Sequence, residues 1–329
     1  MEDKKAKEIV LVARKACFGL PTACPTCLPV YFYLKFAHVP FDLQFNVIHP
    51  DSDQIPYVEY GENVAYNNEK GGVIETLKED GIVDLDSGLP THTIPEWVST
   101  KAMITSWLVD AAIYELWIGC DGSTAYKIYY SDLPWPIGKI LYFKQVYAVK
   151  QQLGITKVNA ERREAEIYRR AAIAYEALST RLGEQTFFFE NRLTSLDAIF
   201  LGHALFVGQV LPDTSVLRSK LLGHGNLIRY IEKFKMEFLE DSSSSSIPRS
   251  PFEPSSSSTP QRRGPSSWSS KPRSKPKREK TEEEKTFRRR AKYFLATQLV
   301  AVLVFLSLMS GSDDADVEVD DDDGLNSED

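Results

Sequence analysis

The sequence at residues 9–47 is IVLVARKACFGLPTACPTCLPVYFYLKFAHVPFDLQFNV, and it indicates how the fold begins. The short apolar run at residues 9–13 is typical of a buried β-strand. A loop and a helical stretch at residues 24–37 follow it. Apolar residues then alternate with polar ones over residues 41–47, which is the period of a half-buried strand. The stretch therefore predicts a strand, a helix and a second strand.

The next segment extends this pattern by two strands and a helix. An Ile55-Pro56 step precedes a strand at residues 57–60, and a helix is expected at residues 72–79. A βαβ unit followed by a ββα unit is a thioredoxin-like order. In that fold the proline before the third strand is usually cis, so Pro56 is a candidate structural residue, an ordinary trans turn being the alternative. We expect a thioredoxin-like domain over residues 1–83.

Two cysteines lie at the start of the predicted helix, in the sequence Cys24-Pro25-Thr26-Cys27. A helix N-terminus lowers the pKa of a nearby thiol, so Cys24 is a candidate nucleophile for redox or transferase chemistry. Two small buried side chains are the alternative, because cysteine is among the most buried residue types. A zinc site would need two further ligands, and none stands at a recognisable spacing. We predict no metal and no cofactor.

Beyond a connector at residues 84–95, the pattern changes to helices. Ile104, Leu108 and Ala111 recur at the three- and four-residue spacing of a helix face. Later, Thr194-Ser195-Leu196-Asp197 opens an apolar run and forms a capping box, in which Thr194 caps the helix and Asp197 reaches back to its amide. Both have a predicted structural role. The fold class is thus α/β followed by α, with an all-helical domain over residues 96–241.

The remainder of the chain does not have the composition of a packed domain. Residues 242–287 are rich in Ser, Pro, Lys and Arg, which predicts a disordered linker. Residues 288–310 hold an apolar run behind a basic flank, and residues 311–329 form an acidic tail. The net charge of −7 hides this segregation and says little about partners. The basic run at residues 271–278 favours lipid headgroups over nucleic acid, or is simply solvated.

The apolar run at residues 293–309, YFLATQLVAVLVFLSLM, has no charged residue. As a helix it would be about 26 Å long, which is short but sufficient for a thin bilayer. A buried soluble helix is the alternative. The basic flank before the run predicts that the preceding domain faces the cytosol, with membrane lipid around one tail-anchoring transmembrane helix. The predicted anchor residues are Tyr293, Phe294, Leu295, Leu299, Val300, Val302, Leu303, Val304, Phe305, Leu306, Leu308 and Met309.

Taken together, these features resemble the glutathione transferase fold, and within it the metaxin family, plant metaxins in particular. The resemblance rests on FGLPT at residues 18–22, residues 66–77, YEALSTRLG at 175–183, LTSLDA at 193–198, and YYSDLPW at 129–135. It implies a single-pass protein of the mitochondrial outer membrane that helps import proteins and assemble β-barrel precursors. The implied partners are mitochondrial precursor proteins and the β-barrel sorting and assembly protein. Metaxins are not catalysts, so the resemblance implies no enzyme and no cofactor.

The chain departs from the transferase pattern at the turn after the fourth predicted strand. Transferases carry an acid-hydroxyl pair there that holds glutathione, whereas residues 67–72 read NNEKGG, without a hydroxyl. Glutathione binding is therefore not carried over by the resemblance. Cys24 keeps a second hypothesis open, a membrane-tethered glutathione transferase or thiol oxidoreductase. A signalling or tethering adaptor with the same anchor and fold is a third.

Overall fold

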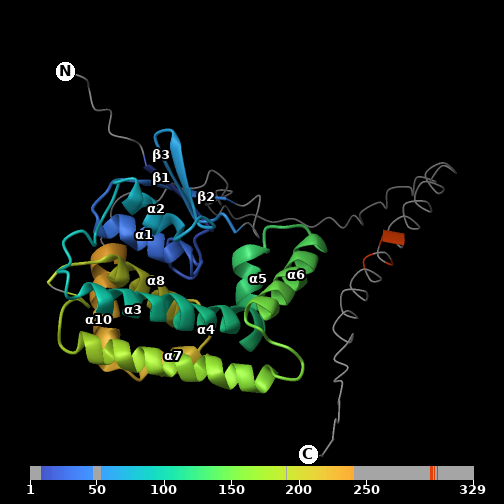
Figure 1. Ribbon diagram of the computed structural model, residues 1–329. Coiled ribbons are helices and arrows are strands. Elements are labelled where there is room, and N and C mark those ends of the chain that lie inside the picture. The colour runs from blue at the N-terminus through green and yellow to red at the C-terminus, as the bar shows by residue number, and fades with distance from the viewer. Residues whose placement is uncertain are drawn as a thin grey trace, which may run out of the picture. The chain divides into compact units, whose positions relative to one another are not determined.

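The computed structural model describes residues 9–46, 53–189 and 191–240, together with 297, 298, 300 and 302 (Figure 1). Two units make up the chain, Met1–Pro251 and Phe252–Asp329, and the fold described below lies in the first. The predicted linker at 242–287 and acidic tail at 311–329 lie outside the described residues, as does almost all of the predicted anchor. Among the described residues, none of the helices combines the length and the apolarity needed to cross a bilayer.

A four-stranded sheet organises the first half of the fold. Its strands are β1 (Ile9–Ala13), β2 (Asp42–Phe45), β3 (Tyr57–Tyr60) and β4 (Asn63–Tyr66), in the spatial order β2-β1-β3-β4. Strand β1 runs parallel to β2 and antiparallel to β3, with Leu11 opposite Leu43 and Val58. The uninterrupted apolar run of β1 suits this central place, because both of its faces are covered. The strand at the β2 edge is less buried, and Phe45 is 43% exposed.

Helices α1 (Cys27–Phe36) and α2 (Gly72–Glu79) belong to this half, and a helical half follows. The predicted order of βαβ, ββα and a helical remainder is confirmed. The later helices are α3 (Ile94–Met103), α4 (Val109–Tyr114), α5 (Ser123–Tyr129), α6 (Ile137–Gln152), α7 (Ala160–Leu182), α8 (Ser195–Gln209), α9 (Val216–Leu222) and α10 (Gly225–Lys235). Single π-helical turns, a form that sequence periodicity does not reveal, cover Ile104–Leu108, Glu115–Gly119 and Met236–Glu240.

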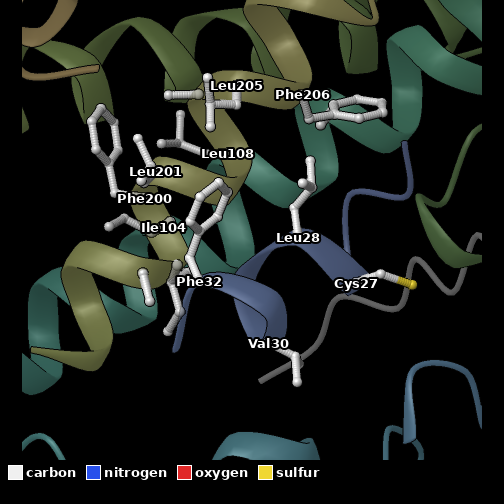
Figure 2. Close-up of a cluster of buried hydrophobic side chains, with 14 of the residues drawn as sticks. Cys27, Leu28, Val30, Phe32, Ile104, Leu108, Phe200, Leu201, Leu205 and Phe206 are labelled. Carbon is white, nitrogen blue, oxygen red and sulfur yellow. The ribbon is translucent and has the colours of Figure 1, made fainter. Parts of the chain in front are cut away.

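Helix α8 is the centre of the core and joins the two halves. Every residue from Ser195 to Val207 is buried, as expected for a helix that is apolar on most of its surface. It packs against α1 so closely that a Cβ atom on Gly202 would lie 2.6 Å from the backbone nitrogen of Pro29. Figure 2 shows the resulting cluster, with side chains from α1 (Leu28, Phe32), from the π-helical turn before α4 (Ile104, Leu108) and from α8 (Leu201, Leu205).

The connector between the halves is bonded on both sides. Asp86 accepts a hydrogen bond from the Ser195 amide at 2.9 Å and forms an ion pair with Lys78 of α2 at 3.1 Å. Arg192 donates to the carbonyl of Leu85 at 3.0 Å. Because the connector is tied to the start of α8 and to the first half at once, it fixes one half on the other.

Candidate functional site

The start of helix α1 carries the predicted thiol pair, but the helix begins later than the sequence indicates. It starts at Cys27, so the prediction of a helix from residue 24 was wrong by three residues. The Cys24 carbonyl accepts the amides of Cys27 and Leu28, each at 3.2 Å. The first of these bonds spans three residues, the tighter spacing of a 3₁₀ turn, so Cys24 lies before the α-helix proper.

Three segments converge on the Cys24 sulfur. Cys24 as a residue is 2% exposed, and its Sγ lies 3.1 Å from Thr26 Oγ1. The Tyr129 hydroxyl, at the end of α5, donates to Sγ at 3.4 Å. Arg14, which directly follows β1, is 6% exposed, and its guanidinium carbon lies 4.9 Å from the centre of the Tyr129 ring. A thiol, a phenol and a buried cation therefore share one site.

The charges around the site distinguish the two cysteines. Burial raises the pKa of the Cys24 thiol, but a hydrogen bond from Cys27, the positive charge of Arg14 and the two hydroxyls outweigh it, and the pKa falls well below its ordinary value. Burial and the neighbouring Cys24 raise the pKa of Cys27. Cys24 is thus electronically suited to be a thiolate, the reactive form of cysteine.

Access to this thiol is closed in the structure. Lys15 forms an ion pair with Asp132 at 2.7 Å and hydrogen-bonds Ser131, which holds the segment after α5 against the segment after β1. The cavity beside the site, lined in part by Arg14 and Tyr129, measures about 10 Å³. That is room for about one water molecule and not for a substrate thiol. Tyr129 contacts both groups, the Cys24 sulfur through its hydroxyl and the Arg14 guanidinium through its ring.

The turn that holds glutathione in transferases uses its polar groups internally here. The Asn67 side-chain amide donates to the Asp53 carbonyl at 3.1 Å. The Glu69 carboxylate accepts the Tyr66 amide at 3.2 Å and lies 3.5 Å from the Thr76 hydroxyl. Gly71 has a positive φ of 88°, and a Cβ there would lie 2.7 Å from Glu75 Cβ. The polar side chains of this turn stabilise the turn and the start of α2.

The predicted structural residues lie at element boundaries. The Ile55-Pro56 peptide bond, directly before β3, is cis. Thr194 and Asp197 form a capping box at the start of α8, with the Thr194 amide 2.9 Å from Asp197 Oδ2. Burial raises the pKa of Asp197 although its carboxylate accepts several hydrogen bonds.

Several residues of these sites were missed by the sequence reasoning. Arg14 and Tyr129 lie more than 100 positions apart, and nothing in either local pattern indicates that they meet at Cys24. Tyr230 donates to Asp197 Oδ1 at 2.7 Å, which no capping motif predicts. The absence of opposite charge beside Arg14 along the chain was the available signal, because a cation that follows a buried strand needs a partner from elsewhere.

Within residues 9–46, 53–189 and 191–240, and at the four described positions beyond, no three His, Cys, Asp or Glu side chains come together as a metal site. Of the predicted anchor, Val300 and Val302 are described and the other residues lie outside the described part.

Two family models match parts of this chain. Residues 25–123 match the family model of the glutathione S-transferase N-terminal domain, and residues 171–234 match that of the glutathione S-transferase C-terminal domain. Among solved structures, the chain is similar to glutathione transferase GSTFuA2 of Phanerochaete chrysosporium, with 12% identity, a TM-score of 0.49, and coverage of 71% of this chain and 99% of that one.

Relatives with similar sequences are more informative. The chain is 57% identical over 321 residues to the Arabidopsis thaliana mitochondrial outer membrane import complex protein METAXIN, which covers 98% of this chain and 99% of that protein. It is 26% identical to human Metaxin-2 over 58% of this chain and 72% of that protein. An identity of 57% along almost the whole of both chains indicates much more than a shared fold. The chain belongs to the metaxin family.

Proposed function

We propose that this chain is a subunit of the mitochondrial outer membrane import complex. The observation that carries the proposal is the 57% identity to the Arabidopsis import complex protein over 98% of this chain. The alignment spans 321 residues of a chain of 329. The residues outside it are fewer than those of the apolar run at 293–309, so the alignment includes at least part of that run. The similarity thus includes the region that we expect to hold the protein on the membrane, as well as the folded part.

The chain acts in this proposal by binding, without catalysis. Cys24 is 2% exposed beneath Tyr129, and the neighbouring cavity of about 10 Å³ admits no substrate. The transferase-like fold then supplies a rigid surface for precursor proteins and for the β-barrel sorting and assembly protein. The family resemblance supplies these two partners.

The proposed topology is that of a tail-anchored, single-pass protein. Residues 293–309 form the membrane helix, and the basic residues before them keep the folded part in the cytosol. Residues 242–287 act as the linker, and residues 311–329 cross to the other side. The thioredoxin-like part at 1–83 and the helical part at 96–241 together form the cytosolic domain.

Purification of the tagged full chain from mitochondria tests the proposal. The import complex and its β-barrel subunit should co-purify in constant ratio, and crosslinking in isolated mitochondria should join the domain to precursors during import. A chain that is recovered without any import component, or that crosslinks only to signalling or tethering proteins, would be an adaptor and would contradict the proposal.

The lowered pKa of Cys24 favours a competing function, a membrane-tethered thiol enzyme. Replacing both Cys24 and Cys27 by Ser separates the two functions, because an import subunit needs neither thiol. Assembly of β-barrel proteins in mitochondria that carry the double variant should match the wild type. Its loss from a correctly folded double variant would favour the thiol function.

A further inference from the structure

The solvent side of helix α6 carries an apolar stripe. Ile140, Phe143 and Tyr147 are 37%, 57% and 37% exposed, and Trp135, just before the helix, is 75% exposed. With about 100° of rotation per residue, Ile140, Phe143 and Tyr147 share one face of the helix. Exposed aromatic and aliphatic side chains gathered in this way mark an interaction surface.

The packed side of α6 faces the other way. The fully buried residues of this helix are Gly138 and Val149, which lie on roughly the opposite side of the helix from Tyr147. A surface helix normally turns its polar face to water and its apolar stripe to the core. In α6 the outward stripe is apolar as well, so packing within the domain does not account for it.

The charges of α6 have a single sign. Lys139, Lys144 and Lys150 are exposed, and the helix Ile137–Gln152 contains no acidic residue. Lys139 and Lys150 project on one flank of the apolar stripe and Lys144 on the other. Exposed apolar and aromatic side chains between lysines are the pattern of a helix that lies in a membrane interface, with the lysines at anionic headgroups.

We infer that the outward face of α6, formed by Ile140, Phe143 and Tyr147 with the three lysines, docks on an anionic lipid surface. The inference rests on the proposed membrane location, and it adds a second contact to the tail anchor. The positive charge favours headgroups over a protein groove, since the stripe has lysine on both flanks and helix α6 itself contains no acidic residue. Docking there would fix the orientation of the domain above the bilayer.

Site-specific photo-crosslinking of the full chain tests this inference. Phe143 is replaced by p-benzoylphenylalanine, and Leu222 of α9, which is 56% exposed, is replaced in the same way as the matched control. Both proteins are reconstituted in vesicles of phosphatidylcholine alone and in vesicles of equal parts phosphatidylcholine and phosphatidylserine. Lipid adducts should form at position 143 several-fold more than at 222, and more in the anionic vesicles.

Charge variants add a second measurement. Lys144→Gln with Lys150→Gln should lower lipid adducts at position 143 in the anionic vesicles by about fivefold for each lysine, and leave them unchanged in the neutral vesicles. Circular dichroism confirms that the variants fold. Equal adducts at positions 143 and 222, or adducts at 143 to a protein when the experiment is repeated in mitochondria, would overturn the inference. Neither result would affect co-purification with the import complex, which tests the proposed function separately.

Discussion

The hydroxyl of Tyr230 in α10 donates to Oδ1 of Asp197 at 2.7 Å, inside the core and at the first turn of α8. Asp197 is fully buried and also accepts the Phe188 amide at 3.2 Å and the Thr194 hydroxyl at 2.7 Å. One carboxylate thus joins the cap of the central helix, the loop before it and helix α10. Its removal would affect all three.

We expect Asp197→Ala to destabilise the protein strongly. The change leaves the Phe188 and Thr194 amides and the Tyr230 hydroxyl without their acceptor, and should cost about 3 to 5 kcal/mol in the free energy of unfolding. The matched control is Tyr230→Phe, which removes one donor and should cost about 1 to 2 kcal/mol. Urea unfolding followed by circular dichroism measures both. Equal losses for the two variants would show that the carboxylate does not join these elements.

Stability should depend on pH through His203. Burial lowers the pKa of His203 to about 3, and its Nε2 lies 2.8 Å from the Tyr175 hydroxyl. In the unfolded chain the imidazole of His203 takes up a proton near pH 6.5, whereas in the folded chain it does so only near pH 3. The free energy of unfolding is therefore highest above pH 6.5 and falls as the pH drops towards 3. The expected loss is about 1.4 kcal/mol for each pH unit below 6.5.

His203→Gln is the control, because its amide can still bond Tyr175 and does not titrate. The unfolding free energy of the wild type, relative to that of the variant, should fall steadily from pH 6.5 to pH 4. Asp197 acts with the opposite sign, since its raised pKa makes acid favour the native state. That contribution is common to both proteins and cancels. Parallel pH profiles would rule out a buried neutral His203.

Much of the fold follows from the sequence, and the exceptions have physical causes. The central strand, the ββα unit and the capping box at Thr194 are local patterns, which a single segment displays. The helix at Cys27 begins after a 3₁₀ turn at residues 24–27. The composition of that turn is the same as that of a helix start, so the sequence does not distinguish the two. Arg14, Tyr129 and Cys24 meet through tertiary packing, and no local period records it.

The Tyr129 side chain covers the Cys24 thiol, and removing that side chain should expose the thiol. Tyr129→Ala removes the ring that covers Cys24, and we expect alkylation of Cys24 by iodoacetamide to become about tenfold faster or more. In the wild type, Cys17, which is partly exposed, should react before Cys24. Burial raises the pKa of Cys120 to about 11, so that thiol should react slowly in both proteins.

Tyr126→Ala is the matched control for Tyr129→Ala. Tyr126 lies on the same helix, α5, and contacts the Tyr130 and Tyr142 rings. Its truncation should leave the alkylation rate of Cys24 unchanged, as peptide mapping by mass spectrometry would record. Fast alkylation of Cys24 in the wild type would show that the site opens without any substitution, and would strengthen the thiol hypothesis.

Truncation before Arg288 tests the anchor. The shortened chain lacks residues 293–309 and should be recovered from cells as a soluble, folded protein, whereas the full chain should stay in the membrane pellet after alkaline extraction. Docking through α6 alone would be stripped by the alkaline step. A truncated chain that resists extraction would reveal a second inserted segment.

The close approach of Gly202 to Pro29 has a consequence for how such a protein can change over time. A methyl group at position 202 would collide with the neighbouring helix backbone, so glycine is the residue that lets α1 and α8 pack at this distance. Variation is then free to act on the outer faces while the interior stays locked. A fold of this kind can change its binding partners and keep its structure.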